Sequence, residues 1–516
     1  MRLLVQLTVD VLGIESGGKP IIFLNKSDAD EIGVTASGRV SLRAKKEITA
    51  IVNISTKTVK KGHIGISEEV RQLFGTAPRK LDVEISAFPK SLQFIRSKLE
   101  GKKLLEGEIY EIVKGVVDGT LNESEIASFV TALHIRGLDL DEATSLSQSM
   151  VKTGKQLSLR NKTIVDKHSI GGVPGDKTTL LVVPIVAAAG LVIPKTSSRA
   201  ITSAAGTADR AECLMPVNLS ADEMKQTVKK TNGCIVWGGA LELAPADDIF
   251  VRTEYSLYID PLLLPSIMSK KKAVGATHVV LDIPTGRGAK VKTINEADYL
   301  AKDLIELGRR LKIHTHCVLS YGEQPVGYTV GPALEAKEAL EVLMNEANVP
   351  DLIDKACKIA GAIFEMTGRK NGYAMAHEII KSGRAEAKLR QIIASQGGNP
   401  KIMPKNIPIG DQTIRLKAKS DGKLLWINNA SVVEIARMAG APKDKGAGVV
   451  FNKKIGDNVS RDDVIFTVHA EKSRKLSRTH DLLEGLNPVG VGKRTDMIIH
   501  MVREIPELKR SFVLER

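Results

Sequence analysis

The sequence predicts a multidomain chain of α/β and α+β architecture: a small N-terminal β domain, a helical domain, an α/β domain with a mainly parallel central sheet, and a C-terminal α+β domain. Length is the first reason, because 516 residues exceed one compact core and about one domain per 150 residues gives three or four domains. The second is a change of hydrophobic period near Pro89, and the third is an alternation of strands and helices from about Thr163.

The first two domains differ in the spacing of their apolar residues. Alternating runs such as "LLVQLTVDVLGI" and "GRVSLRA", broken by Gly and Asp, predict strands and hence a small β domain over residues 1–84. Helical spacing follows, and Asn122 with Glu125 makes a capping pair ahead of an apolar run. We therefore expect short helices over residues 85–158, joined by the segment of about 237–275.

Residues 159–400 alternate between strand and helix patterns. "TIVDKHS", "LVIPKTSS" and "THVVLDIPTG" indicate strands, and the Ala-rich "TTLLVVPIVAAAG" between the first two indicates a helix. This alternation predicts a parallel sheet, whose ligands gather at the carboxyl ends of its strands. Residues 410–516 return to short strands and Gly turns with one helix, which predicts the C-terminal α+β domain.

The net charge limits the choice of ligand. Lys and Arg number 74 against 60 Asp and Glu, and the resulting charge of +14 favours anionic ligands such as phosphates, nucleotides or nucleic acid. Aromatic residues make up only 4%, few for the stacking platforms of single-strand binders, and the lysines are dispersed. Small anions are therefore favoured, with no nucleic acid as partner.

Cysteine usage and the N-terminus bear on the compartment. The four cysteines stand apart without a Cys-x-x-Cys pair, so neither a zinc site nor a disulfide framework is indicated, and a reduced cytoplasm fits best. The N-terminus alternates in polarity, and no apolar run reaches the roughly 18 residues of a membrane span. We expect a cytoplasmic protein without a membrane partner.

A glycine-rich loop, "KHSIGGVPGDK", follows one predicted strand and precedes a helix. Bare amides, as at Gly172, can bind an anion there, with Lys167 and Ser169 beside them. It is not a triphosphate P-loop, because Asp176 stands where that motif needs glycine. The alternative is a turn that only reverses the chain, and His168 is equally a packed or a catalytic residue.

Two further stretches carry candidate chemistry. Asp260 stands among apolar residues that can raise a carboxyl pKa, which suits a proton donor, although Asp-Pro is also a common helix start. Ser266 and Lys270 are four residues apart and share a helix face. Lys290 follows a strand in "DIPTGRGAK". It is either a phosphate contact or a solvated lysine in a turn.

A Ser/Thr-rich loop follows another strand in "PKTSSRAITSAAGTADRAE", where hydroxyls and Arg199 offer donors to phosphate oxygens. Such a loop alone is usually just solvated, but two of them after neighbouring parallel strands indicate a site. His314 and His316 alternate as metal ligands can, yet they lie in a probable strand without a third ligand, so no metal is predicted.

Taken together, these stretches resemble the thymidine phosphorylase and AMP phosphorylase family. "KHSIGGVPGDK", "PKTSSRAITSAAGTAD", "WGGALELAPADD", "SIMSKKKAVG", "DIPTGRGAK" and "VGPALEA" follow the family order over roughly residues 85–490. The extra N-terminal β domain, the Pro in "GVPG" and the loop "SRAITS" are most similar to the archaeal-type AMP phosphorylases. The spacing from Asp260 to Ser266 is slightly shorter than the family pattern.

The resemblance implies a reaction and a set of site residues. The reaction is phosphorolysis, in which AMP and phosphate give adenine and ribose 1,5-bisphosphate, with Asp260 as proton donor, phosphate as co-substrate and no cofactor. The implied nucleotide and phosphate contacts are Gly172, Ser198, Arg199, Ala200, Ile201, Thr202, Ser203, Thr207, Ser266 and Lys290, with Lys167, His168, Ser169 and Lys270 as further candidates. A homo-oligomer is also expected.

Three other functions stay open at this point. A thymidine or other pyrimidine nucleoside phosphorylase would give free base and (deoxy)ribose 1-phosphate by the same chemistry. A phosphoribosyltransferase shares such loops, but its diphosphate and magnesium signature is absent from the sequence. A non-catalytic nucleic-acid binder requires a contiguous basic face, which the sequence does not show.

Overall fold

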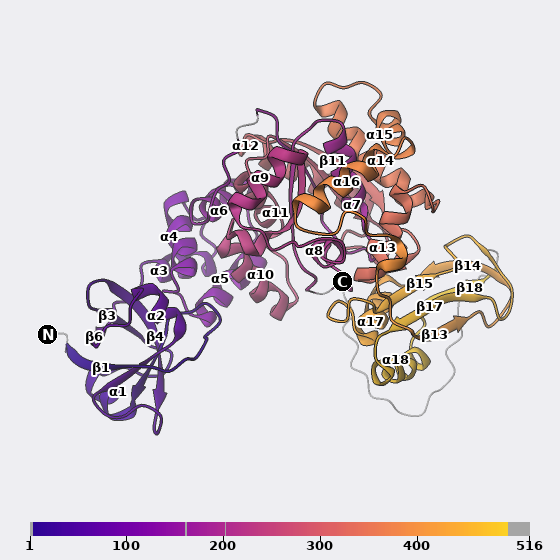
Figure 1. Ribbon diagram of the computed structural model, residues 1–516. Helices are drawn as coiled ribbons and strands as arrows, with labels where there is room; N and C mark the ends of the chain where they lie inside the picture. The colour runs from indigo at the N-terminus through magenta and orange to yellow at the C-terminus, as the bar shows by residue number, and fades with distance from the viewer. Residues whose placement is uncertain (1–3, 160–161, 202, 494–516) are drawn as a thin grey trace.

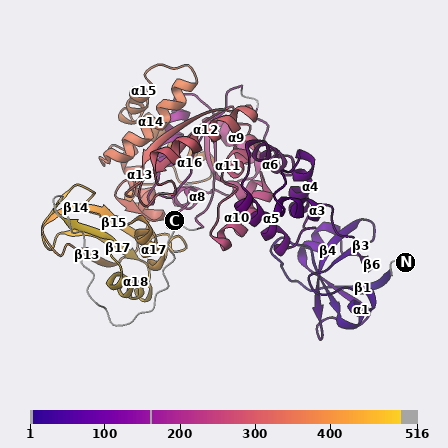
Figure 2. The same ribbon diagram turned by 180° about the vertical axis from the view of Figure 1, so that it is seen from behind.

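The computed structural model describes residues 4–159, 162–201 and 203–493. It confirms the predicted multidomain α/β and α+β fold. The N-terminal β barrel lies at one end of an elongated molecule, helices follow it, the α/β part occupies the middle and the C-terminal strands form the other end (Figure 1). The reverse view shows the same order (Figure 2). The predicted domain boundaries themselves stay a prediction.

The N-terminal part is a closed six-stranded barrel in the order β1-β5-β2-β4-β3-β6. Its inward residues, such as Leu24, Val40 and Ile64, are fully buried, as expected where alternate residues of a strand face one core. Its strands and helices are β1 (Val5–Val11), β2 (Ile21–Asn25), α1 (Lys26–Ile32), β3 (Arg39–Arg43), β4 (Glu47–Ser55), β5 (His63–Ile66), α2 (Glu68–Phe74) and β6 (Lys80–Ile85).

A cluster of helices follows, and two later helices join it. The helices are α3 (Ser91–Leu99), α4 (Glu106–Val117), α5 (Glu123–Arg136), α6 (Leu140–Lys152), α10 (Pro245–Leu257) and α11 (Leu263–Ala273), with a 3₁₀ turn η1 at Gly238–Leu241 before α10. The predicted cap of α5 is confirmed, because the Asn122 side chain accepts from the Glu125 amide at 3.0 Å and Glu125 accepts from the Asn122 amide at 2.8 Å.

The α/β part carries parallel strands in the orders β11-β10-β7 and β8-β9, and a parallel bridge between Ile164 and Val192 connects the two groups. The strands are β7 (Val165–Ser169), β8 (Ile193–Ser197), β9 (Gly233–Trp237), β10 (His278–Thr285) and β11 (His314–Tyr321). The helices are α7 (Thr178–Ala188), α8 (Thr207–Ala211), α9 (Ala221–Thr231), α12 (Ile294–Arg310), α13 (Pro332–Leu343), α14 (Pro350–Met366), α15 (Gly372–Lys381) and α16 (Arg384–Ser395).

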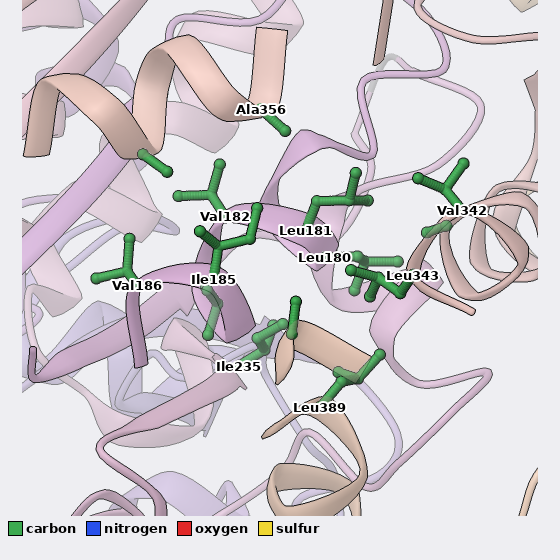
Figure 3. Packing of buried hydrophobic residues seen from close by; sticks show 14 of the residues in the cluster. Leu180, Leu181, Val182, Ile185, Val186, Ile235, Val342, Leu343, Ala356 and Leu389 are labelled. Carbon is green, nitrogen blue, oxygen red and sulfur yellow. The ribbon is translucent and has the colours of Figure 1, made fainter. Parts of the chain in front are cut away.

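Helix α7 is the centre of the largest core. It is apolar on all sides, because α14 and α16 cover the faces that the sheet does not. Figure 3 shows Leu180 and Leu181 on α7 close to Leu343 of α13, with Leu389 of α16 nearby. This packing fixes the helix whose N-terminus follows the glycine-rich loop.

Among its described residues, the C-terminal part holds two small sheets, two α-helices and one 3₁₀ turn. The sheets have the orders β12-β15-β17-β13 and β16-β14-β18. Strand β12 (Thr329–Val330) comes from the region predicted to be α/β, yet it pairs with β15 of the C-terminal sheet. The elements are η2 (Pro404–Asn406), β13 (Gln412–Lys417), β14 (Gly422–Ile427), α17 (Asn429–Ala439), β15 (Gly448–Phe451), β16 (Asn458–Val459), β17 (Val464–Ala470), α18 (Ser473–Gly485) and β18 (Val489–Gly492).

Two kinds of feature are absent from the described residues. Within residues 4–159, 162–201 and 203–493, no helix has the length and apolar character needed to cross a membrane. In the same part of the chain, no three His, Cys, Asp or Glu side chains are arranged to hold a metal ion.

Candidate active site

The glycine-rich loop leaves β7 in a backbone conformation that favours glycine. Gly171 and Gly172 have φ angles of 83° and 91°, in the left-handed region. The Ser169 hydroxyl at the end of β7 accepts from the Gly171 amide at 3.4 Å. A Cβ at Gly172 would lie 2.7 Å from the Lys290 backbone nitrogen, so this loop packs directly against the turn after β10.

Lys290 in turn connects this loop to the predicted proton donor. Its Nζ lies 2.8 Å from Oδ2 of Asp260, and the two side chains are 47% and 44% exposed. The apolar residues beside Asp260 in the sequence predict an apolar environment for its carboxyl. The structure corrects this prediction, because the carboxylate lies beside the Lys290 ammonium and is partly exposed to solvent. Gly172, Lys290 and Asp260 are nevertheless contiguous, although they come from three separate segments.

A cavity of about 340 Å³ lies beside Asp260. Its walls come from α5, α6, α11 and α12 and are mostly apolar, with Asp303 and His134 as polar members. The apolar part includes Leu133, Leu138 and Leu264. The predicted donor therefore stands at the rim of a hollow between the helical part and the α/β part.

Lys167 is a buried cation without a close partner in the described part of the chain. It is 2% exposed, and burial lowers the pKa of its ammonium, while the Asp176 and Asp282 carboxylates oppose that shift. Both carboxylates instead pair with Lys355, at 3.3 and 2.8 Å. Among the described residues no carboxylate lies within 4 Å of the Lys167 ammonium, and an anion at the loop would supply the missing charge.

His168 is uncharged in this environment. Burial holds the pKa of its imidazole well below the usual range, and the ammonium groups of Lys271 and Lys195 lower it further. Lys271 is itself bound to Asp166 at 2.7 Å, with both side chains almost completely buried. A neutral imidazole next to the loop can accept or donate one hydrogen bond, but it brings no positive charge.

The Ser/Thr-rich loop is closed on itself by one carboxylate. Asp209 Oδ2 accepts from the amides of Ala200 and Gly206 at 2.7 and 2.9 Å. The Arg199 guanidinium donates to Asp209 at 3.2 Å and to both oxygens of Glu212 at 2.9 and 2.6 Å, and the Glu212 bond raises the pKa of Arg199. Arg199 therefore fixes the loop and is not a free donor to phosphate.

The other candidates in this loop lie near its two ends. Ser198 follows β8, and its carbonyl accepts from the Ala208 amide at 3.2 Å. The Ser203 hydroxyl donates to the Ala205 carbonyl at 3.3 Å. Thr207 is the first residue of α8. Ala200 and Ile201 are in the same loop, and Thr202 lies outside the described residues.

Helix α11 presents Ser266 and Lys270 one turn apart, as the four-residue spacing predicts. Lys270 Nζ lies 2.5 Å from the buried Asp247 carboxylate of α10. Burial opposes the charged form of Lys270, but the carboxylates around it, Asp247 foremost, together outweigh burial and raise the pKa of the Lys270 ammonium. Lys270 therefore joins two helices, and both Ser266 and Lys270 are partly exposed.

Arg210 was missed by sequence reasoning and connects the two loops. Its guanidinium donates to the Asp176 carbonyl at the end of the glycine-rich loop and to the Ala205 carbonyl at 2.7 Å. Its Nε lies 3.0 Å from the buried Glu335 carboxylate of α13. The two predicted anion loops are thus held side by side. An arginine within a short helix gives no sequence signal for such a role.

Helix α17 of the C-terminal part also reaches the Ser/Thr-rich loop and the Lys290 turn. Arg437 Nη1 donates to the Ile201 carbonyl at 2.7 Å, and Asn429 Nδ2 donates to the Gly322 carbonyl at 2.8 Å. A Cβ at Gly288, two residues before Lys290, would lie 3.3 Å from Asn429 Nδ2. One helix therefore supports the Ser/Thr-rich loop at one end and the Lys290 turn at the other.

Three family models match successive parts of the chain. Residues 161–386 match the glycosyl transferase family, a/b domain, and residues 92–154 match the helical bundle domain of that family. Residues 425–487 match the pyrimidine nucleoside phosphorylase C-terminal domain. Among solved structures, the anthranilate phosphoribosyltransferase of Thermus thermophilus superimposes with a TM-score of 0.49 at 19% identity, covering 58% of this chain and 98% of that chain.

Curated relatives align over nearly the whole chain. The AMP phosphorylase of Thermofilum pendens is 48% identical over 513 residues, 99% of this chain and 100% of the relative. That of Pyrococcus furiosus is 45% identical over 503 residues, 96% and 99% of the two chains. That of Thermococcus kodakarensis is 48% identical over 481 residues, 92% and 95% of the two chains.

The chain therefore belongs to the glycosyl transferase family that these domains define. Within it, the chain belongs to the group of the AMP phosphorylases, which confirms the resemblance found in its motifs.

Proposed function

We propose that the protein is a pentosyltransferase that cleaves nucleoside 5'-monophosphates with phosphate, converting AMP and phosphate to adenine and ribose 1,5-bisphosphate in nucleotide metabolism. The observation that carries this proposal is the contact of Gly172 with Lys290 and of Lys290 with Asp260, in a chain similar over its length to AMP phosphorylases.

The chemistry assigns each of these groups a task. An oxygen of phosphate attacks C1' of the ribose, a C–O bond forms, and the C–N bond to the base breaks. The base nitrogen then takes a proton from Asp260, so the base leaves as a neutral molecule. Positive charge that develops on the sugar is stabilised by the phosphate dianion, so the site must hold that dianion next to the ring.

Lys290 has two anionic partners available in this scheme. It pairs with Asp260 before phosphate binds, and the same ammonium is within reach of an anion at the Gly172 amide. Transfer of Lys290 from Asp260 to phosphate releases the Asp260 carboxyl from its ion pair. The carboxyl is then free to face the departing base.

The remaining proposed contacts come from the two loops and α11. The substrate contacts that we propose are Gly172, Ser198, Ala200, Ile201, Thr202, Ser203, Thr207, Ser266 and Lys290, with Lys167, His168, Ser169 and Lys270 in support. Arg199 acts here by fixing the loop through Asp209 and Glu212. A nucleoside monophosphate brings a 5'-phosphate in addition to the attacking phosphate. Two adjacent loops and the Lys167 ammonium, which has no carboxylate partner among the described residues, support the presence of two anion sites.

Product analysis tests this function. Purified protein is incubated with AMP, CMP, UMP or thymidine in phosphate buffer, and free base is measured by chromatography. We expect release of adenine from AMP that depends on phosphate. Efficient cleavage of thymidine with no cleavage of AMP would overturn the proposal and favour a pyrimidine nucleoside phosphorylase. Release without added phosphate would indicate hydrolysis.

We further propose a cytoplasmic location and a homo-oligomeric assembly. The four cysteines are unpaired thiols, and burial raises the pKa of Cys234 and Cys317, which suits a reducing compartment. Light scattering on the purified chain measures the assembly, and a molar mass equal to the chain mass of 55.8 kDa would contradict an oligomer.

A further inference from the structure

Glu254 on α10 holds the segment that carries Asp260. Its side chain is 4% exposed, and its Oε1 accepts from the backbone amide of Leu262 at 2.9 Å. Its own carbonyl accepts from the Ile259 amide at 3.2 Å. Between α10 and these contacts the chain turns through Tyr258, whose φ is 55°. Both the side chain and the backbone of Glu254 therefore fix the turn on which Asp260 sits.

Four charged groups surround this buried carboxyl. Asp260 and Asp247 are the acidic neighbours, and Lys290 and Lys270 are the basic ones. Each lysine already pairs with one of the aspartates, at 2.8 and 2.5 Å. Among the described residues no cation forms an ion pair with Glu254, so its negative form has no direct compensation.

The packing of α10 against the other neighbouring helices is apolar. Helices α4, α5 and α6 pack against α10 through one apolar cluster, in which the rings of Phe129 and Phe250 lie 5.9 Å apart. Burial in these surroundings raises the pKa of Glu254 to about 8, the Leu262 amide opposes the shift, and Asp260 and Asp247 raise it further. At neutral pH the carboxyl is therefore mostly protonated.

We propose that Glu254 is a positioning residue: its buried carboxyl, which accepts from the Leu262 amide, holds Asp260 and Lys290 in the arrangement needed for proton donation and anion binding. This inference rests on the phosphorolysis proposed above. An uncharged carboxyl still accepts from the Leu262 amide, so the turn stays fixed. An ionised one adds a second carboxylate beside Asp260 and attracts Lys290 away from phosphate.

The pH profile of kcat/KM tests this role. In the wild type we expect activity to fall as pH rises through about 8, where Glu254 ionises. Glu254→Gln keeps an oxygen acceptor for Leu262 and stays uncharged, so it should retain activity at pH 7 within about threefold while this alkaline fall disappears. Glu341→Gln on α13 is the matched control, because burial raises the pKa of this carboxyl too, away from Asp260.

A second variant and an assay of base release by the wild type distinguish failure of the Glu254 role from failure of the proposed function. Glu254→Met is also uncharged but cannot accept from Leu262, so we expect a loss of kcat at all pH values, again without the alkaline fall. If wild-type protein releases no base from any nucleotide, the proposed function fails. If the wild type is active and either folded variant keeps the alkaline fall, the role of Glu254 alone is overturned.

Discussion

Gly172 and Lys290 meet through their backbones: a Cβ at residue 172 would lie 2.7 Å from the Lys290 nitrogen and 3.0 Å from its Cγ. This contact sets how closely the loop after β7 approaches the turn after β10. It joins the predicted anion loop to the lysine that pairs with Asp260.

Replacing Gly172 by Ala should push Lys290 away from the loop. We expect phosphorolysis to fall more than about tenfold, because displacement of a positioning group by a fraction of an ångström is costly. Gly171→Ala is the matched control, since it has a similar positive φ and meets no atom within 4 Å. Equal losses in steady-state assays of the two variants would show that backbone strain alone is responsible.

Asp260→Asn should remove the proton donor and leave the turn in place. A general acid contributes on the order of 10² to 10⁴ in rate, so kcat should fall in that range while the melting temperature changes little. Activity of Asp260→Asn within threefold of wild type would exclude Asp260 as the donor.

Replacing Lys290 by Met should instead raise the KM for phosphate.

Arg437→Ala should loosen the Ser/Thr-rich loop from α17. The lost bond to the Ile201 carbonyl lies in a loop that we propose as a substrate contact, so KM should rise several-fold while thermal stability changes little. Arg415→Ala, an exposed change on β13, serves as the control. An unchanged KM in Arg437→Ala would mean that α17 does not support substrate binding.

Three histidines on neighbouring strands should make stability depend on pH. Rings of His278 and His314 lie 5.4 Å apart, and those of His314 and His316 lie 4.9 Å apart. Burial and these neighbours lower the pKa of His278 and His316, so the folded chain binds fewer protons than the unfolded chain below about pH 6.5. Stability should therefore fall as pH decreases through that value.

The double substitution of His278 and His316 by Gln should reduce this loss. Its melting temperature should decrease less than that of the wild type between about pH 7 and pH 5. The single exposed His480→Gln on α18 is the comparison. A double variant with the same acid dependence as the wild type would contradict a role for this cluster.

Local patterns in the sequence were sufficient for the elements that lead into the site. The strand, glycine turn and helix around Gly172 follow from hydrophobic period and backbone freedom, both of which depend on adjacent residues. The cap of α5 by Asn122 likewise depends on a spacing of three residues. Such features are decided within one turn or one strand.

Features that depend on distant segments were not predictable. Arg199 was expected to bind phosphate, but Asp209 and Glu212 occupy its guanidinium. The apolar sequence around Asp260 suggested burial, yet those side chains turn into the helical core and leave the carboxylate beside Lys290. Two other features depend on how separate parts of the chain pack together. They are the contacts of α17 with the Ser/Thr-rich loop and the Lys290 turn, and the pairing of β12 with β15.

The central claim is that phosphate attacks C1' of AMP in this site. Phosphorus NMR of a reaction with AMP and phosphate measures it most directly, alongside quantification of adenine. We expect one phosphate to be consumed for each adenine released, with signals of a sugar that carries phosphate at C1' and C5'. Formation of ribose 5-phosphate with unchanged phosphate, or AMP left intact by active, folded protein, would contradict the account.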